Sequence, residues 1–210
     1  MSTFFIADVH LSGQSPAIVD AFVDFCHEQC DQMDALYILG DLFDAYLGFD
    51  CRASWFKRVI HAITNLAAKK PVYIMPGNHD FLMSKQDCVA MGCHWLQDPC
   101  VMTFQDKKIL LTHGDLLCVH DHAHQRMRKF FDQQWLQCLW FALPYRARVA
   151  IADGIQRKTK RATAIKTEVM MDVCPTEVAG WLKKYHADLL VHGHTHRPDI
   201  EVNGPVKRIV

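Results

Sequence analysis

The feature that most constrains this chain is the segment Ala35–Leu39 followed by Gly40 and Asp41. This apolar run ends abruptly in a glycine and a carboxylate, and a short apolar run bounded by glycine is typical of a buried strand. Asp41 is then expected just beyond the carboxyl end of the strand, where open α/β sheets build their sites. The same arrangement recurs at four other places, and each delivers Asp, Asn or His. The repetition predicts an α/β fold with a metal centre at one edge of a sheet.

The remaining pattern predicts further strands and helices around this one. Strands are expected at Phe4–Ala7, Val72–Met75 and Leu189–Val191, and a hairpin at Val101–Phe104 and Ile109–Leu111 with its turn at Asp106–Lys107. Helical spacing predicts helices after Ser15–Pro16 and around Trp55–Ile63. Thr176 is expected to cap a short helix, and Asn203–Gly204 to turn a hairpin. The organisation expected is one domain over residues 1–210, with a helix-rich insertion at 116–175.

The residues delivered at the strand ends form a candidate ligand set. It consists of Asp8, His10, Asp41, Asn78, His113, His194 and His196. Oxygen donors mixed with imidazole suit borderline divalent ions such as Mn²⁺, Fe²⁺ or Zn²⁺. With Asp41 shared, such a set matches two ions ~3.5–4 Å apart, as in two-metal phosphoryl-transfer sites. Any one of these residues alone has an ordinary structural explanation, but five motifs at five strand ends together do not. His192 is interpreted as a buried core histidine.

Charge and cysteine content narrow the class of protein. The 23 basic and 23 acidic residues give a formal net charge of +0, which provides little attraction for a phosphate backbone, so we expect no nucleic-acid partner. Nine cysteines, without a signal-peptide pattern before them, indicate reduced thiols in the cytoplasm. No apolar run approaches the ~20 residues of a membrane-spanning helix. We therefore expect a cytoplasmic protein and a monomer.

The motifs resemble those of a known family, the calcineurin-like metallophosphoesterases. They are Asp8-Val9-His10, Gly40-Asp41-Leu42-Phe43-Asp44, Gly77-Asn78-His79-Asp80, His113-Gly114-Asp115 and Gly193-His194-Thr195-His196. The resemblance implies a sandwich of two central mixed sheets flanked by helices, with the insertion as a helical cap. It implies one metal ion on Asp8, His10, Asp41 and His196, and a second on Asp41, Asn78, His113 and His194. It also implies catalytic roles for Asp41, Asn78, His79 and His113.

The insertion contains an apolar block with basic flanks. The block is Trp135, Leu136, Leu139, Trp140, Phe141 and Leu143, between Arg126, Arg128 and Lys129 on one side and Arg146 and Arg148 on the other. Such a pattern suits an acyl-chain cavity or a helix at an anionic lipid surface, and it suits the insertion's own core equally well. Thr159, Thr163 and Lys166 share one helical face that could receive a phosphate, and a solvated face is the alternative.

Within the superfamily, the chain is similar to the UDP-2,3-diacylglucosamine pyrophosphatase family of lipid A biosynthesis. The similarity lies in Phe5–Asp8, Ala35–Phe43, His113–Cys118, Trp135–Gln137, Ala142–Pro144, Met171–Val173 and His192–Pro198. It implies hydrolysis of a glycolipid nucleotide at the α-phosphorus, giving UMP and 2,3-diacylglucosamine 1-phosphate, with two divalent metal ions, usually Mn²⁺. It implies substrate contacts from Asn78, Asp121, Thr159, Thr163, Lys166 and His194. Peripheral contact with the cytoplasmic face of the inner membrane is expected.

The chain departs from that family in a few places. Position 79 is His where the family generally has Arg, and Thr159 and Thr163 stand where Ser and Asn are more usual. The leaving group would be a phosphomonoester with a second pKa of ~6, which barely needs an acid. We therefore expect His79 to bind the pyrophosphate rather than protonate the leaving group. The family continues past Val210, so we expect either that the chain is truncated relative to it or that this lineage is shorter.

Two alternatives remain open. One is another enzyme of the superfamily, acting on another nucleotide, such as a dinucleoside polyphosphate, or on a phosphoprotein. That enzyme would leave the aromatic block and the Thr159, Thr163 and Lys166 face without a role. The other is a scaffold of the same fold without turnover. Such scaffolds tend to lose metal ligands, whereas this sequence has the complete candidate set.

Overall fold

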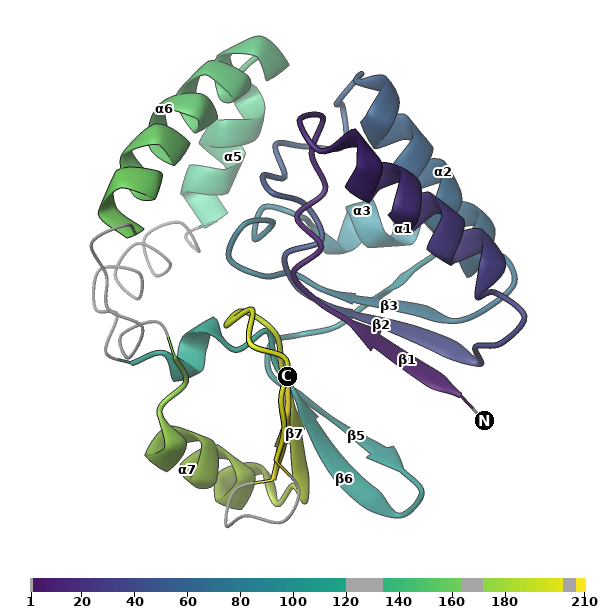
Figure 1. Ribbon diagram of the computed structural model, residues 1–210. Helices are drawn as coiled ribbons and strands as arrows, with labels where there is room; N and C mark the ends of the chain where they lie inside the picture. The colour runs from purple at the N-terminus through teal and green to yellow at the C-terminus, as the bar shows by residue number, and fades with distance from the viewer. Residues whose placement is uncertain (1, 120–133, 164–171, 202–206) are drawn as a thin grey trace.

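The computed structural model describes residues 2–119, 134–163, 172–201 and 207–210, with side chains except those of residues 134 and 156–163. Figure 1 shows two β-sheets between outer layers of helices, with a pair of helices standing apart above them. This layering confirms the predicted α/β sandwich. Each layer buries one face against its neighbour, which is how two-sheet domains build their cores.

The first sheet is parallel, with the strand order β1-β2-β3-β4. Its strands are β1 (Thr3–Ile6), β2 (Ala35–Leu39), β3 (Val72–Met75) and β4 (His94–Trp95). The register aligns Tyr37 with Phe5 on one side and with Tyr73 on the other, and the rings stack at centroid distances of 5.1 and 4.5 Å. Parallel sheets are covered on both faces, which explains why these strands are almost continuously apolar.

Two long helices cover the outer face of the first sheet. They are α1 (Pro16–Glu28) and α2 (Ser54–Ala67), and Figure 1 places both on the same side of β1–β3. Phe22 of α1 and Ile63 of α2 are buried in the core that the helices share with the sheet. Apolar residues at helical spacing therefore mark the face of each helix that packs on the sheet.

Two short elements follow β3 without a clear periodic signal in the sequence. The helix α3 (Lys85–Ala90) begins with a capping box, in which Ser84 and Asp87 exchange hydrogen bonds with each other's backbone. The two-residue strand β4 then adds a fourth strand to the sheet by pairing with β3. Elements this short span less than two turns or a single strand pair, so hydrophobic periodicity does not detect them.

The second sheet is mixed and has the order β5-β6-β7-β9-β8. Its strands are β5 (Cys100–Phe104), β6 (Lys107–Leu111), β7 (Leu189–Val191), β8 (Ile200–Glu201) and β9 (Arg208–Ile209). The predicted hairpin is present as β5 and β6, but the prediction of its turn is wrong by one residue. Phe104 pairs with Lys107, so Gln105 and Asp106 form the turn, both with positive φ. The turn predicted at 203–204 lies outside the described residues.

The helix α7 (Pro175–Tyr185) covers the outer face of the second sheet. Its N-cap residue is Cys174, with Pro175 in the first turn, so the cap predicted at Thr176 is wrong by two residues. Proline suits the first helical turn because its missing N–H would have no intrahelical partner there. Val178 of α7 is buried against Leu110 and Leu190 of the sheet.

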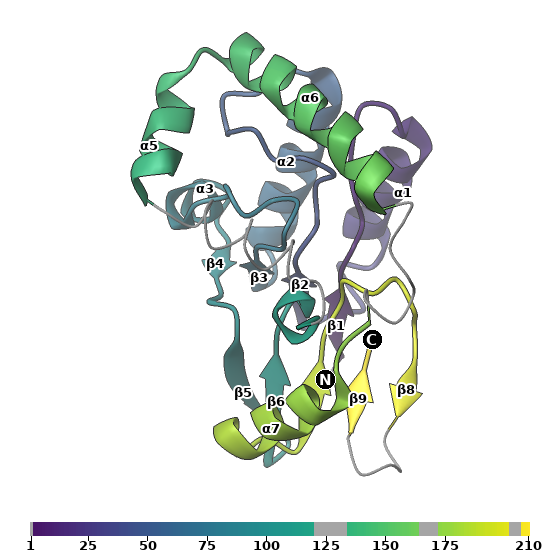
Figure 2. The same cartoon turned by 90° about the vertical axis from the view of Figure 1, so that its left-hand side faces the viewer.

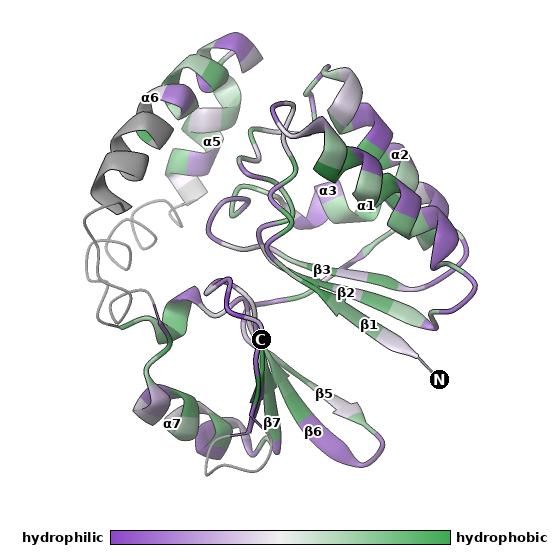
Figure 3. Ribbon diagram, viewed as in Figure 1, coloured by the Kyte–Doolittle hydropathy of each residue, from purple (hydrophilic) through white to green (hydrophobic). Residues whose placement is uncertain are grey.

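A separate apolar layer joins the two sheets. Leu39 and Met75 of the first sheet pack with Ile109, Leu111 and Val191 of the second. Figure 3 shows that β1–β3 and β7 are largely hydrophobic along their length. Because Leu39, Met75, Leu111 and Val191 are the last residues of their strands, the layer brings the carboxyl ends of β2, β3, β6 and β7 close together.

Above this edge stands a helical hairpin, which we call the cap hairpin. It consists of α5 (Gln134–Ala142) and α6 (Tyr145–Thr163), inside the predicted insertion at 116–175. Figures 1 and 2 both place it over the carboxyl ends of the strands. Its apolar side chains are unusually exposed, with Trp135 at 61%, Leu139 at 62% and Ile151 at 42%. In the described ranges, no helix combines the length and apolar character required to cross a membrane.

Candidate metal centre

The candidate ligands follow five strands that end at the same edge. Asp8 and His10 follow β1, Asp41 follows β2, Asn78 follows β3, His113 follows β6, and His194 and His196 follow β7. Among the residues that the structure describes, three groups of side chains have ligand atoms within 4.8 Å of one another. They are Asp8, His10 and His196; His10, Asp41 and His79; and Asp41, His113 and His194. The sequence-predicted set is therefore gathered in one place, and its role in metal binding stays a prediction.

Five of these residues have a left-handed backbone conformation. Their φ values are 55° at Asp8, 51° at His10, 52° at Asp41, 71° at His194 and 53° at His196. Non-glycine residues rarely adopt such values, and each costs on the order of 1–3 kcal/mol unless its surroundings enforce it. Here neighbouring strand ends hold each other, since Asp8 N donates to Gly40 O at 3.2 Å and His10 N to Asp41 O at 3.0 Å. This concentration of backbone strain makes the edge a candidate functional site.

At one end of the site, Asp8, His10 and His196 face one another. The Nε2 atoms of His10 and His196 are 3.1 Å apart. Nε2 of His196 is 3.7 Å from Oδ1 of Asp8, and Nε2 of His10 is 3.8 Å from Oδ2 of Asp41. Oδ1 of Asp8 is buried and accepts no hydrogen bond from the described residues. A buried carboxylate oxygen without a donor is costly unless a cation takes that role.

At the other end, His113 lies between Asn78 and Asp41. Its Nε2 is 3.0 Å from Oδ1 of Asn78 and 3.5 Å from Oδ2 of Asp41. Its Nδ1 is 3.0 Å from the carbonyl oxygen of Leu39, which can only accept a hydrogen bond. In the neutral ring the proton is therefore on Nδ1, and Nε2 presents its lone pair to the site. The His194 ring is 5.1 Å from the His113 ring, between centroids. Asp41 thus belongs to both ends of the site.

The charges of the site are strongly coupled. Burial would raise the pKa of Asp41, but His113 and His79 outweigh burial and hold this pKa below its ordinary range. Burial would lower the pKa of His113, but Asp41 outweighs it and raises the pKa to about 10. Burial raises the pKa of Asp8 above its ordinary value. Without cations, the site therefore retains protons that a metal ion would have to displace.

Asp80 supports the candidate site in a way that the sequence pattern alone does not reveal. It is fully buried and accepts hydrogen bonds from four backbone N–H groups. The donors are Gly77 at 2.6 Å, Leu42 at 2.8 Å, Asp41 at 3.2 Å and Phe43 at 3.4 Å. Burial, followed by the charge of Asp41, raises the pKa of Asp80 to about 6. Asp80 therefore ties the turn that carries Asp41 to the turn that carries Asn78, and its place in the Gly77–Asp80 motif is the signal that could have identified it.

Close packing at Gly77 leaves no space for a side chain. A Cβ built there would collide with the Asp41 carboxylate and lie 2.8 Å from Cε1 of His113. A Cβ at Gly193 would lie 2.5 Å from Oδ2 of Asp8, the oxygen that accepts from His194 N at 2.8 Å. Glycine is required at both positions because ligands from different strands approach the backbone directly.

The donor set fits divalent cations. It combines carboxylate, amide and imidazole donors, which suit borderline metals. The ring proton of His113 is held by a backbone carbonyl, which fixes the ligating nitrogen as metal sites require. Oδ1 of Asp8, which accepts no hydrogen bond from the described residues, is a further candidate metal ligand in the group of Asp8, His10 and His196. Asp8, His10 and His196 could hold one cation, and Asn78, His113 and His194 a second, with Asp41 between them.

His79 lies at the rim of the site, on the side of Asp44. Its Nδ1 is 2.8 Å from the carbonyl oxygen of Asp44 and 3.8 Å from Oδ1 of the same residue. Its ring meets that of His10 edge-on at 4.8 Å between centroids. Its backbone N–H donates to Oδ1 of Asp41 at 2.8 Å. The Asp44 carbonyl therefore holds the Nδ1 proton and leaves Nε2 for contact with a ligand.

Four of the predicted substrate contacts have no side chain in the described part of the chain. Asp121 and Lys166 lie outside the described residues. Thr159 and Thr163 lie on α6, but their side chains are outside the described part of the chain. His192 is buried, as predicted, and burial lowers its pKa to about 4. Its Nδ1 is 2.8 Å from the carbonyl oxygen of Gly193.

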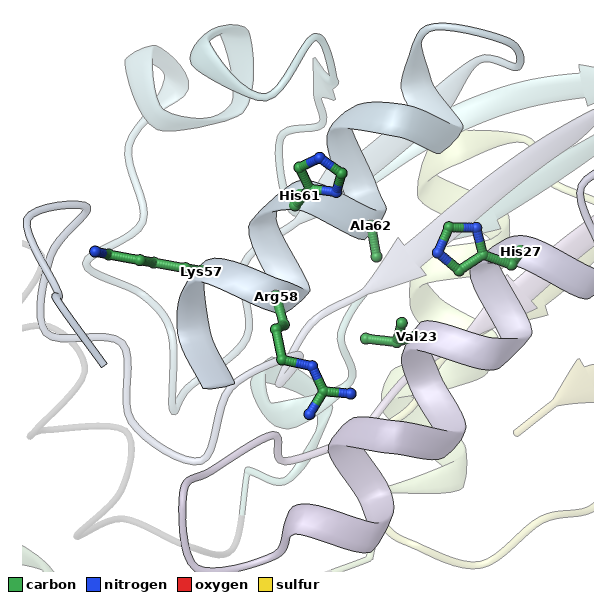
Figure 4. A pocket seen from close by; sticks show the side chains of 6 residues that line it. All are labelled: Val23, His27, Lys57, Arg58, His61 and Ala62. Carbon is green, nitrogen blue, oxygen red and sulfur yellow. The ribbon is translucent and has the colours of Figure 1, made fainter. Parts of the chain in front are cut away.

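A shallow hollow of about 280 Å³ lies away from this edge, between α1 and α2. Figure 4 shows it lined by Val23 and His27 from α1 and by Lys57, Arg58, His61 and Ala62 from α2. Arg58 is paired with Asp20 at 2.6 Å. The hollow lies on the outer surface of the two helices, and we assign no function to it.

Comparison with known proteins agrees with this geometry. The family model described as calcineurin-like phosphoesterase matches residues 1–198. Three curated relatives are each named UDP-2,3-diacylglucosamine hydrolase. The one from Coxiella burnetii (strain Dugway 5J108-111) is 39% identical over 99% of this chain and 87% of its own length. The one from Aeromonas hydrophila is 37% identical over 100% and 89%, and the one from Haemophilus influenzae is 38% identical over 99% and 88%. The chain is a member of the calcineurin-like phosphoesterase family.

Proposed function

We propose that this chain is a metal-dependent hydrolase of UDP-2,3-diacylglucosamine in lipid A synthesis. It cleaves the pyrophosphate at the α-phosphorus and releases UMP and 2,3-diacylglucosamine 1-phosphate. The observation that carries the proposal is the shared carboxylate of Asp41 between two ligand groups, in a chain whose relatives of this name match nearly its full length. The predicted family and the predicted hydrolase are supported by the same matches.

The chemistry needs a nucleophile and charge compensation at phosphorus. Two divalent cations, which we propose to be Mn²⁺, supply both by activating water and offsetting the charge of phosphate oxygens. The chain's own residues hold this arrangement. Asp41 keeps the two ligand groups together, and Asp80 fixes the turn of Asp41 through backbone N–H groups. Asn78 and His113 face the same point, with 3.0 Å between Oδ1 and Nε2.

His79 is proposed to contact the pyrophosphate. Its Nδ1 is held by the Asp44 carbonyl, so its Nε2 is the atom available for the substrate. A large loss of turnover in His79→Gln that is recovered with better leaving groups would contradict this role and indicate a general acid. Equal losses with good and poor leaving groups are expected from a residue that binds the pyrophosphate.

The cap hairpin is proposed to take the acyl chains. Its exposed apolar side chains, Trp135 and Leu139 on α5 and Ile151 and Ile155 on α6, are available to lipid. Asp121, Thr159, Thr163 and Lys166 are proposed to contact the polar part of the substrate. We also propose that the protein is a cytoplasmic monomer that contacts the inner membrane peripherally, because a diacylated substrate resides there.

The test is a comparison of two substrates with the Mn²⁺-loaded protein. Release of UMP from UDP-2,3-diacylglucosamine is measured beside hydrolysis of bis(4-nitrophenyl) phosphate, which has no acyl chains. We expect kcat/KM for the glycolipid to exceed that for the aryl diester by roughly a thousandfold or more, since remote binding energy is used in catalysis. Hydrolysis of the aryl diester without UMP release would point to another substrate of the same family. Absence of both activities in protein that binds metal would favour a scaffold.

A further inference from the structure

Among the described residues, Arg148 is the most deeply buried lysine or arginine side chain. It lies in the first turn of α6, and its side chain is 3% exposed; every other Lys or Arg side chain in the described part is more accessible. Burial of a guanidinium group is costly unless its donors find acceptors and its charge finds a partner. A buried cation at the base of an otherwise exposed hairpin therefore needs an explanation.

The guanidinium group of Arg148 joins the cap hairpin to the core. Its Nε donates to the carbonyl oxygen of Leu143, between α5 and α6, at 3.1 Å. Its Nη1 donates to the carbonyl oxygen of Leu47, and its Nη2 to the carboxylate of Asp50. Leu47 and Asp50 belong to the core segment 44–51, which we call the anchor loop. One side chain thus bonds to both parts of the molecule, through the rigid fork that distinguishes arginine from lysine.

The surroundings of Arg148 are shaped to hold it. Its guanidinium carbon lies 5.6 Å from the ring centroid of Phe141 and 5.5 Å from that of Tyr145. A Cβ at Gly48 would collide with Nη1 of Arg148 and lie 3.3 Å from the Phe141 ring. Two aromatic faces and a glycine therefore form the pocket, in which cation–π attraction adds to the hydrogen bonds. Tyr145 adds a second tie by donating to Sγ of Cys51 at 2.9 Å.

The other end of the anchor loop reaches the metal centre. The Asp44 carbonyl holds Nδ1 of His79 at 2.8 Å, and Oδ1 of Asp44 is 3.9 Å from Nδ1 of His10. Tyr46 N donates to the carbonyl oxygen of His79 at 3.2 Å, and the Tyr46 ring is buried in the core. The loop is thus fixed beside His79 at its beginning and beside Arg148 at its end.

We propose that Arg148 is a positioning residue that sets the cap hairpin in register with the metal centre through the anchor loop. The residue does not act on phosphorus. It determines where the apolar face of the cap hairpin stands relative to the reacting group, and so it governs recognition of the acyl chains. This consequence for substrate rests on the proposed function, whereas the structural tie does not.

The test compares Arg148→Met with Arg146→Met in the metal-loaded full chain. Both variants remove a cation from the first turn of α6, but Arg146 is exposed. Loss of charge-assisted bonds is expected to raise amide hydrogen exchange in α5 and α6 by roughly tenfold or more in Arg148→Met, with α1 and α2 unchanged. Arg146→Met is expected to exchange as the parent does. Arg148→Lys keeps the charge on one compact ammonium group without the planar fork and should recover only part of the protection.

Kinetics give the second readout. In Arg148→Met, KM for UDP-2,3-diacylglucosamine is expected to rise about tenfold, while kcat/KM for bis(4-nitrophenyl) phosphate stays within about twofold. Unchanged exchange in α5 and α6, or an equal rise in every element, would overturn the proposal, as would a parallel fall with both substrates. If the chain releases no UMP at all, the proposed function fails, and hydrogen exchange still decides whether Arg148 positions the hairpin.

Discussion

The metal centre and the cap hairpin are built in opposite ways. At the metal centre, the side chains from five strand ends are buried or half-buried apart from the exposed His196, their turns are held by backbone hydrogen bonds, and the packing is so close that Gly77 cannot carry a Cβ. In the cap hairpin, large apolar side chains such as Trp135 and Leu139 are mostly exposed. Figure 1 shows the two helices outside the two-sheet sandwich. We infer that the first region sets the chemistry and the second selects the substrate, so their variants should affect different kinetic constants.

The largest effect is expected from Asp41→Asn. This change removes the charge shared by both ligand groups while keeping the shape of the side chain. We expect kcat for either substrate to fall by roughly 10²–10³ and the affinity for Mn²⁺ to fall in parallel. The matched control is Asp20→Asn, an exposed carboxylate on α1 that pairs with Arg58. Normal metal binding and normal turnover in Asp41→Asn would contradict the inference that the metal centre sets the chemistry.

The second effect is a dependence of metal affinity on pH. Asp41 raises the pKa of His113 to about 10, despite burial, and burial raises the pKa of Asp8. His113 therefore carries a proton that metal binding must release, and a higher pH favours the deprotonated ring that can bind metal. Between about pH 6 and pH 8, the apparent Kd for Mn²⁺ should fall by about tenfold per pH unit for each proton released. A competition titration with a chromophoric chelator measures this, and a Kd independent of pH would contradict it.

A third variant, Gly77→Ala, tests the close packing directly. The new Cβ would press against the Asp41 carboxylate and the His113 ring. We expect a loss of about 1–3 kcal/mol in the free energy of unfolding, measured by urea denaturation, together with weaker metal binding. Gly180→Ala in α7 is the control, because nothing lies within 4 Å of a Cβ there. That control should be neutral or stabilising by at most about 1 kcal/mol. Equal behaviour of the two variants would show that the strand ends are looser than described.

The smallest effect is expected from the cap hairpin. Leu139→Ser removes an apolar side chain that is 62% exposed, so stability should hardly change. If acyl chains cover this residue, KM for the glycolipid should rise about threefold to tenfold, with the aryl diester unaffected. Val89→Ser on α3 is the control, since Val89 is 63% exposed on the core. Identical kinetic constants in the two variants would remove the cap hairpin from substrate selection.

The sequence predicted the parts of this molecule whose signal is local. The strands at Ala35–Leu39 and Val72–Met75 are present with the predicted bounds, because buried parallel strands are apolar runs bounded by polar or turn residues. The ligand set could be listed because each member directly follows such a strand. The prediction for the hairpin turn was wrong by one residue, because the turn lies at Gln105–Asp106. Register depends on pairing between strands and not on the turn residues alone.

The parts that the sequence did not predict depend on contacts between distant segments. A carboxylate such as Asp80 could equally be a metal ligand. Only the fold shows that it accepts hydrogen bonds from the backbone N–H groups of Leu42 and its neighbours. Arg148 belongs to the basic flank of the apolar block, a pattern that suits an acyl-chain cavity or a lipid-facing helix, yet its partners Leu47 and Asp50 lie about a hundred residues earlier. Side-chain chemistry at that separation is set by tertiary packing, which no local pattern encodes.

We propose that one carboxylate, Asp41, joins two metal sites at the edge of the sandwich. The most direct measurement is the number of Mn²⁺ ions retained per chain after loading and gel filtration, determined by elemental analysis. We expect about two ions per chain in the parent protein and a clear loss in Asp41→Asn. Fewer than about one ion per chain in the parent, under saturating Mn²⁺, would contradict the account.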